Sequence, residues 1–323
     1  MPSTMTHSYF AYDIYKKISN KDKISNIENF KLYCQGTDPF MFYNYLIGKK
    51  NKYYCKIQNI THTTKTKDYF INIIKYIIEN NLTDNKEVIT FLYGNICHYF
   101  LDLKTHPFIY YKTGKFNKKD KNTYKYNTLH QDMEYSIDKY LIIKNNTKTK
   151  NFKIHKEIFN NYYITKEVTD CLKYTIKKTY NIKISGKEYK KSVKMMKRFF
   201  HLFNYDKFGI KKRIYCLIDK ITPPNTIKIE KLAYNYKNIN IDYLNLSHKK
   251  WNHPSIKNEI YYDSFFDLYN SALNEALEAI NVVNDCLAKK KIDYKKINKV
   301  FKNLSAVTGK DCNLNLPLKY FEF

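Results

Sequence analysis

Two imidazoles and a carboxylate recur at helical spacing within one apolar segment, residues 94–111 (GNICHYFLDLKTHPFIYY). His98, Asp102 and His106 are each four residues apart, so on an α-helix they share one face. A buried carboxylate without a partner would cost several kcal/mol or would neutralise itself by binding a proton. Neutral imidazole nitrogens and carboxylate oxygens are good zinc ligands, so a bound metal would remove this cost. The spacing therefore predicts a helix that presents ligands to a metal.

A second segment repeats the pattern, because His130 and Glu134 are also four residues apart. Pairs of this kind on facing helices are how helical proteins build metal centres in their interior. One pair is a weak signal, since a lone histidine on an apolar face is more often a core residue. Two pairs together are a much stronger signal, and we expect a metal site between these helices.

Proline follows the first motif directly, at position 107. The residue before a proline is disfavoured in the α conformation. We therefore expect the helix over residues 86–106 to end there, which would leave His106 to face a different ligand set from that of His98.

The nine histidines are unevenly distributed along the chain, with five of them in the first 130 residues. His7 and His62 join the three histidines of the two motifs as candidate ligands. The other four are expected to be structural or on the surface: His155, His201, His248 and His253.

The elements that must position these side chains are predicted to be helices. Apolar residues recur with a helical period in five segments, residues 67–81, 86–106, 129–144, 188–204 and 265–288. Ser264 and Asp267, three residues apart, resemble a capping box at the start of the last one. Only seven glycines and seven prolines are present, which argues against a turn-rich all-β fold.

Two stretches between the helices are expected to be irregular, residues 107–128 and 220–263. The first contains six lysines and lies between the two ligand motifs, so it could flank a site. The chain has neither an internal repeat nor a linker-like shift in composition. We therefore predict an all-α fold, a single compact multi-helix domain over residues 1–323, in which residues 1–145 form the metal-site core and residues 146–323 a C-terminal helical layer.

The charge balance is strongly basic, with 57 Lys and Arg against 30 Asp and Glu, a formal net charge of +27. Such a charge attracts phosphate-rich partners, either nucleic acid or an anionic membrane surface. The lysines are scattered over the whole chain, which is typical of a compositional bias, and we attribute most of the charge to that bias.

The location of the protein is predicted from three absences in the sequence. No apolar run is long enough for a transmembrane segment. The first residues lack the pattern of a signal peptide. The seven cysteines contain no CxxC pair, which argues against a disulfide framework. We expect a cytoplasmic protein that could contact membranes peripherally.

The sequence resembles a known family, the zinc-dependent phospholipase C family in its cytoplasmic-type branch. The resemblance rests on five motifs: Pro2-Ser-Thr-x-Thr-His7, Gly36-Thr-Asp-Pro39, Ile60-Thr-His-Thr63, His98-x3-Asp102-x3-His106-Pro107, and His130-x3-Glu134. Two later segments, Tyr205-Asp-Lys207 with Lys211-Lys212, and Asp242 to Trp251 followed by Pro254, also look like family segments.

The resemblance implies an all-α fold with a site for three zinc ions. Asp38, His62, His98 and Asp102 would hold one ion, and His106, His130 and Glu134 a second. His7 and a bridging Asp102 would hold the third, which in the family is completed by an N-terminal tryptophan. The only tryptophan here is Trp251, so the expected complement is two to three zinc ions.

The function implied is hydrolysis of a phospholipid phosphodiester by a metal-activated water, with Asp38 and Asp102 as catalytic residues. Zinc-dependent single-strand nucleases share the fold and the ligand set, so nucleic acid is the alternative substrate. A protein that keeps zinc only for structure is the third possibility. A structural site is closed, whereas a catalytic site keeps a position for water.

Overall fold

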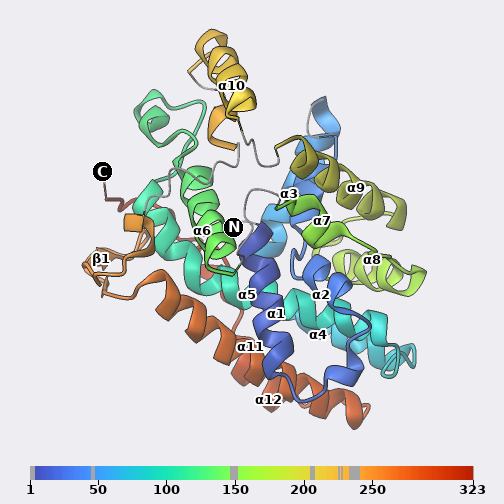
Figure 1. The fold of residues 1–323 in the computed structure, drawn as a ribbon. Helices are drawn as coiled ribbons and strands as arrows, with labels where there is room; N and C mark the ends of the chain where they lie inside the picture. The colour runs from blue at the N-terminus through green and yellow to red at the C-terminus, as the bar shows by residue number, and fades with distance from the viewer. Residues whose placement is uncertain are drawn as a thin grey trace.

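The computed structural model describes residues 4–44, 48–145, 152–203, 208–224, 226, 228–232 and 241–322 (Figure 1). Twelve α-helices lie in this part of the chain, and its only strands are two of two residues each, which confirms the all-α prediction. The helices are α1 Thr4–Lys17, α2 Ile27–Tyr33, α3 Gly48–Thr63, α4 Thr66–Glu79, α5 Lys86–Thr113, α6 Leu129–Asn145, α7 Ile154–Phe159, α8 Lys166–Tyr180, α9 Gly186–Leu202, α10 Ile210–Ile221, α11 Phe265–Ala288 and α12 Tyr294–Val300. Strands β1 Trp251–Asn252 and β2 Ile260–Tyr261 pair antiparallel, and short 3-10 turns include η2 Asp38–Phe42, η3 Lys121–Tyr126 and η5 Ile229–Leu232.

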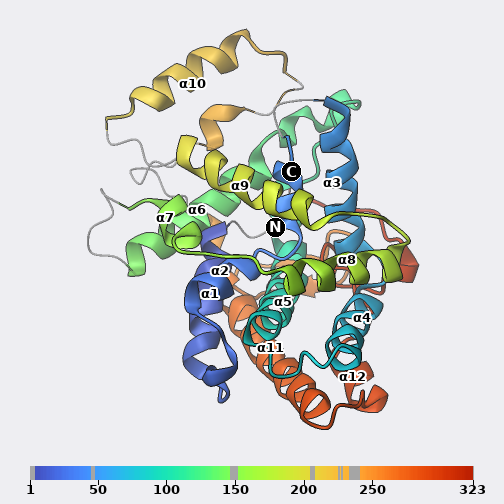
Figure 2. The ribbon, with the colours of Figure 1, turned by 90° about the vertical axis from the view of Figure 1, so that its right-hand side faces the viewer.

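Helix α5 is the centre of the molecule, and α1, α2, α6 and α11 all pack against it (Figures 1 and 2). The side chain of Asn85 caps its start by accepting from the backbone N–H groups of Glu87 and Val88. Most of its residues are buried, so its polar side chains must find partners inside the protein.

The expectation that Pro107 ends this helix is wrong. Helix α5 continues to Thr113, and Gly114, with a φ of 65°, follows it as the C-cap. Proline removes the hydrogen bond to the Leu103 carbonyl and costs about 3 kcal/mol in a helix interior. Packing over the whole length of α5 outweighs this cost, and the segment at Gly309 lies against Leu103 and Pro107 at the weakened turn.

The other predicted helices agree closely with the structure. The segment 265–288 is α11, and Ser264 with Asp267 forms the capping box that the sequence indicated. The segments 67–81, 129–144 and 188–204 correspond to α4, α6 and α9, with ends displaced by one or two residues. A second capping box, made by Ser185 and Glu188, starts α9.

The two stretches expected to be irregular are so only in part. Residues 107–113 belong to α5, and η3 follows within the lysine-rich stretch. In residues 220–263 the described parts are the end of α10, short turns and the two short strands. The seven cysteines are free thiols, as predicted. Positions 2–3 and 205–207, which contributed to two of the motifs, lie outside the described residues.

One hydrophobic core cluster extends from α1 to the segment after α12. The division into a metal-site core and a C-terminal layer stays a prediction. Among the described residues, every helix is too short or too polar to cross a membrane.

Candidate metal centre

The eight predicted ligands come from five separate elements that meet around α5. All are buried except His130, which is half-buried. The ligand atoms form three groups, each with atoms within 4.8 Å of one another: His7, His98 and Asp102; Asp38, His62 and His98; and His106, His130 and Glu134.

The second group, Asp38, His62 and His98, lies beside Asp102. His62 Nε2 lies 2.9 Å from His98 Nε2 and 3.2 Å from Asp102 Oδ2. Asp38 Oδ1 lies 3.4 Å from the same His62 nitrogen and 3.9 Å from that of His98. Ligands at zinc bond lengths of about 2.0–2.1 Å are separated by roughly 3.3 Å along the edges of a tetrahedron. Most of these separations are near that length, so the group, with Asp102 beside it, could hold a metal ion.

Backbone carbonyls orient both imidazoles of this cluster. His62 Nδ1 is 2.7 Å from the Gln58 carbonyl, and His98 Nδ1 is 3.2 Å from the Cys34 carbonyl. A carbonyl only accepts, so each Nδ1 carries the proton and each Nε2 presents a lone pair. Two lone pairs facing each other at 2.9 Å repel unless a cation lies between them. Such outer hydrogen bonds are the usual support of histidine metal ligands.

Gly36 permits the close approach of Asp38 and His98. It has a φ of 54°, and a Cβ at this position would lie 2.3 Å from Cδ2 of the His98 ring. Any other residue would push the turn that carries Asp38 away from α5.

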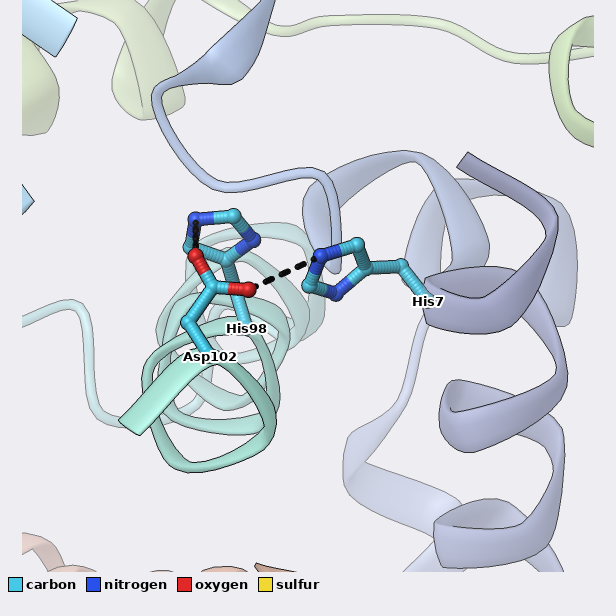
Figure 3. Close-up of side chains that lie close together, drawn as sticks. All are labelled: His7, His98 and Asp102. Atoms are coloured by element: carbon cyan, nitrogen blue, oxygen red, sulfur yellow. Dashed lines mark ion pairs between the residues drawn. The ribbon is translucent and has the colours of Figure 1, made fainter. Parts of the chain in front are cut away.

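Asp102 connects two of the groups. Its Oδ1 lies 3.2 Å from His7 Nε2, whereas its Oδ2 lies 3.4 Å from His98 Nε2. Figure 3 shows this arrangement, with His98 and Asp102 on α5 and His7 reaching in from α1. Both oxygens of Asp102 and both ring nitrogens of His7 are buried without a hydrogen bond among the described residues. Buried polar atoms in native proteins normally have partners, so this centre has the chemistry of a metal site.

The third group lies one turn further along α5. His106 Nδ1 is 2.5 Å from the Ala306 carbonyl, which leaves its Nε2 free to bind a metal. His130 Nε2 lies 2.9 Å from Glu134 Oε1, and its Nδ1 is 3.5 Å from the Thr113 hydroxyl. His106 thus faces a different set from His98, as expected, but it does so within the helix, because about two turns along α5 change the neighbours from η2 and α3 to α6.

The electrostatics of the centre differ from one ligand to the next. Burial lowers the pKa of His98 and of His106 well below the usual value. Burial alone would raise the pKa of Asp102, but the imidazoles of His106 and His98 hold it well below its usual value. Burial raises the pKa of Asp38 to about 6, and these four groups are in the protonation state that binds zinc at neutral pH. Burial alone would lower the pKa of His62, but Asp102 and Asp38 raise it.

Helix α1 is held in place by a residue that the sequence analysis missed, Asp138 of α6. Its fully buried carboxylate accepts from the backbone N–H of Met5 at 3.1 Å, and from the N–H and hydroxyl of Thr6, both at 2.7 Å. These N–H groups have no partner inside the first turn of a helix, and a negative charge is favourable there. His7 follows directly, so this contact sets its position.

Asp138 could have been predicted from the sequence, because it lies four residues after Glu134 on the same predicted helix. The roles of the Cys34, Gln58 and Ala306 carbonyls could not have been predicted, since every residue has a carbonyl. The remaining four histidines belong to none of the metal groups in the described part of the chain. His248, for example, is exposed and lies near Asp267.

A cavity of about 520 Å³ opens beside His130. The lysine-rich stretch forms one side of it through Lys115 and Lys118, and Tyr110 and Tyr126 also line it. A second cavity of about 480 Å³, between α5, α11 and the C-terminal segment, contains none of the candidate ligands.

An all-α fold with clustered, buried histidines and carboxylates defines a helical metalloprotein. The family model of zinc-dependent phospholipase C matches residues 6–186, more than half of the chain. The protein therefore belongs to the zinc-dependent phospholipase C family. The match ends before the segment from Asp242 to Trp251. No curated protein and no solved structure matches the chain.

Proposed function

We propose that the protein is a zinc-dependent phosphodiesterase of phospholipase C type, which hydrolyses a phospholipid to diacylglycerol and a phosphorylated head group. Asp102 is the observation that carries the proposal, because its two oxygens lie toward different imidazoles, His7 on one side and His62 with His98 on the other. A carboxylate in this position can bridge two metal ions, and paired ions suit displacement at phosphorus.

We assign the ligands as the family resemblance implies. One zinc is held by Asp38, His62, His98 and Asp102, a second by His106, His130 and Glu134, and a third by His7 with Asp102. The second set contributes three protein ligands, which leaves a coordination position for water or substrate. This open position distinguishes a catalytic centre from a structural one.

Two side chains of the protein, Asp38 and Gln58, have specific roles in the proposed hydrolysis. Bound zinc ions offset the charge of the phosphodiester and lower the pKa of a bound water to about 7. Asp38 would also orient the attacking water and accept its proton. The Gln58 amide donates to Asp38 Oδ1 at 3.1 Å and holds it in place. As the water oxygen forms its bond to phosphorus, the bond from phosphorus to the glycerol oxygen would break. The proton taken up by Asp38 would then pass to that oxygen, which leaves as diacylglycerol.

The cavity beside His130 supports an anionic substrate. Lys115 and Lys118 line it next to a ligand of the second zinc, and the formal net charge of the chain is +27. The aromatic rings of Tyr110 and Tyr126 in the same cavity would also suit stacked bases, which makes a single-strand nuclease the second candidate.

A side-by-side assay tests the proposal. The zinc-loaded protein is incubated with phosphatidylcholine vesicles and with single-stranded DNA, and the Asp102→Asn variant is treated in the same way. Release of diacylglycerol by the wild type alone is the expected result. Cleavage of DNA without cleavage of lipid would establish the nuclease, and a zinc-loaded protein inactive on both would leave a structural role for the metal.

A further inference from the structure

Helix α10 exposes an apolar stripe to solvent. None of its residues is buried, and its spacing places five large apolar side chains on one face. Their exposed fractions are 57% for Ile210, 49% for Ile214, 63% for Leu217, 37% for Ile218 and 84% for Ile221. Phe208, just before the helix, is 72% exposed. A contiguous exposed stripe of this kind marks an interaction site in a folded protein.

The opposite, polar face attaches α10 to the rest of the protein. The Asp219 carboxylate accepts from the backbone N–H groups of Ile229 and Glu230 in η5, at 3.0 Å and 2.8 Å. Lys212 forms an ion pair with Glu230 at 3.3 Å. A helix of a globular domain normally turns its apolar stripe toward the core. Here the stripe faces away from the polar anchors and from Tyr215, whose ring contacts Phe203. The helix lies at the edge of the molecule, far from α11 and α12 (Figures 1 and 2).

Basic residues flank the stripe on both sides. Lys211 lies beside Ile218 in the helical projection, and Arg213 and Lys220 lie beside Leu217 on the other side. Asp219, the single acidic residue of α10, is turned toward η5. The face that α10 presents outward is therefore apolar along its middle and positive along its edges.

We propose that α10 docks the protein on a lipid bilayer containing anionic lipids, with the stripe inserted among the acyl chains and the flanking cations at the head groups. Amphipathic helices with basic flanks bind membrane interfaces through these two contributions together. A second copy of the chain fits less well, since it would bring a formal charge of +27 against another +27. The inference rests on the proposed function in one respect: a phospholipase must reach a substrate that lies in a bilayer.

Binding of the full-length, zinc-loaded protein to vesicles tests the inference directly. The vesicles consist of phosphatidylcholine alone or of phosphatidylcholine mixed with phosphatidylserine, and bound protein is measured by sedimentation. Leu217→Ser on α10 is compared with Leu314→Ser, a leucine that is 60% exposed elsewhere on the surface. Wild type and Leu314→Ser should bind the mixed vesicles equally, and Leu217→Ser should bind them about tenfold more weakly. Ile221→Ser provides a second variant with the same expected loss.

Equal binding by the Leu217 and Leu314 variants would overturn the inference, as would a wild type that binds neither vesicle. A wild type that is dimeric in solution, with Leu217→Ser monomeric, would assign the stripe to a second copy instead. Vesicles of non-hydrolysable phospholipid analogues with the same head groups measure docking of the zinc-loaded protein without hydrolysis. If docking follows α10 but no phospholipid is ever cleaved, the proposed function fails and the docking surface stands. If all variants cleave a soluble short-chain phospholipid equally while vesicle binding does not depend on α10, the proposed function stands and the docking surface fails.

Discussion

His62 and His98 direct their Nε2 atoms at each other across 2.9 Å, and both rings hold their protons on the far nitrogen, where backbone carbonyls accept them. Two facing lone pairs with the carboxylates of Asp38 and Asp102 beside them suit the binding of a cation. The strongest predictions for this protein follow from that relationship.

The purified protein should contain two to three zinc ions per chain by metal analysis. Removing them with a chelator should lower the melting temperature, because a ligand at about 100 times its Kd contributes about 2.7 kcal/mol. Zinc content near zero, with a melting temperature that the chelator does not change, would contradict the site assignment.

Asp102→Asn should reduce phosphodiester hydrolysis at least about a hundredfold while the helical content stays unchanged. The amide cannot supply a charged oxygen to each of two ions, so the bridge is lost. Asp285→Asn, at an exposed ion pair with Lys296, serves as the control and should keep full activity. An Asp102 variant as active as this control would exclude the bridging role.

Gly36→Ala should reduce zinc content and activity, whereas Gly209→Ala should change neither. Both glycines have a positive φ, so alanine carries a similar backbone strain of about 1 kcal/mol at each position. Only at Gly36 would the new Cβ collide with the His98 ring, because nothing lies within 4 Å at Gly209. Metal analysis of the two variants measures the effect of the collision alone, and equal zinc contents would contradict this explanation.

Asp138→Asn should weaken the attachment of α1 and destabilise the fold by about 1–3 kcal/mol, measured by urea unfolding. The amide loses the charge that the first turn of α1 favours, and one of its two polar atoms cannot accept from Met5 or Thr6. Zinc at the His7 position should be lost first. Asp285→Asn, at the exposed ion pair with Lys296, is the control and should retain nearly wild-type stability. Loss of stability in both variants to the same extent would remove the special role of Asp138.

Acid should destabilise the zinc-free protein in two steps: the buried, neutral His98 and His106 oppose folding below about pH 6.5, and the carboxyls add a further loss below about pH 4. The folded-state pKa of Asp102 lies well below its usual value, and that of Glu134, next to His130, is also lowered. A lowered folded-state pKa stabilises the fold above the unfolded-state pKa, and this contribution is lost as the pH falls through the folded-state value. The free energy of unfolding should therefore fall with decreasing pH by up to about 1.4 kcal/mol per pH unit for each carboxyl. Asp102→Asn should show a shallower slope, and a slope identical to that of the wild type would contradict the assignment.

Much of this protein could be predicted from its sequence, because the relevant physics is local. Helical periodicity and capping residues act within a few residues, so α11 and its capping box at Ser264 agree with the prediction. The i, i+4 spacing of His98 with Asp102 and of His130 with Glu134 determines that each pair shares a helix face, whatever lies around it.

Tertiary structure decided what depends on contacts distant in the sequence. Pro107 does not end α5, because packing along the buried helix outweighs a local penalty. Asp138 reaches Met5 and Thr6 across more than 130 residues, and no local pattern encodes that contact. An apolar stripe such as that of α10 normally faces a core, and the attachment of Asp219 to η5 helps to turn it outward. Spacing along one helix is a property of the chain, whereas the direction in which a helix faces is decided by what packs against it.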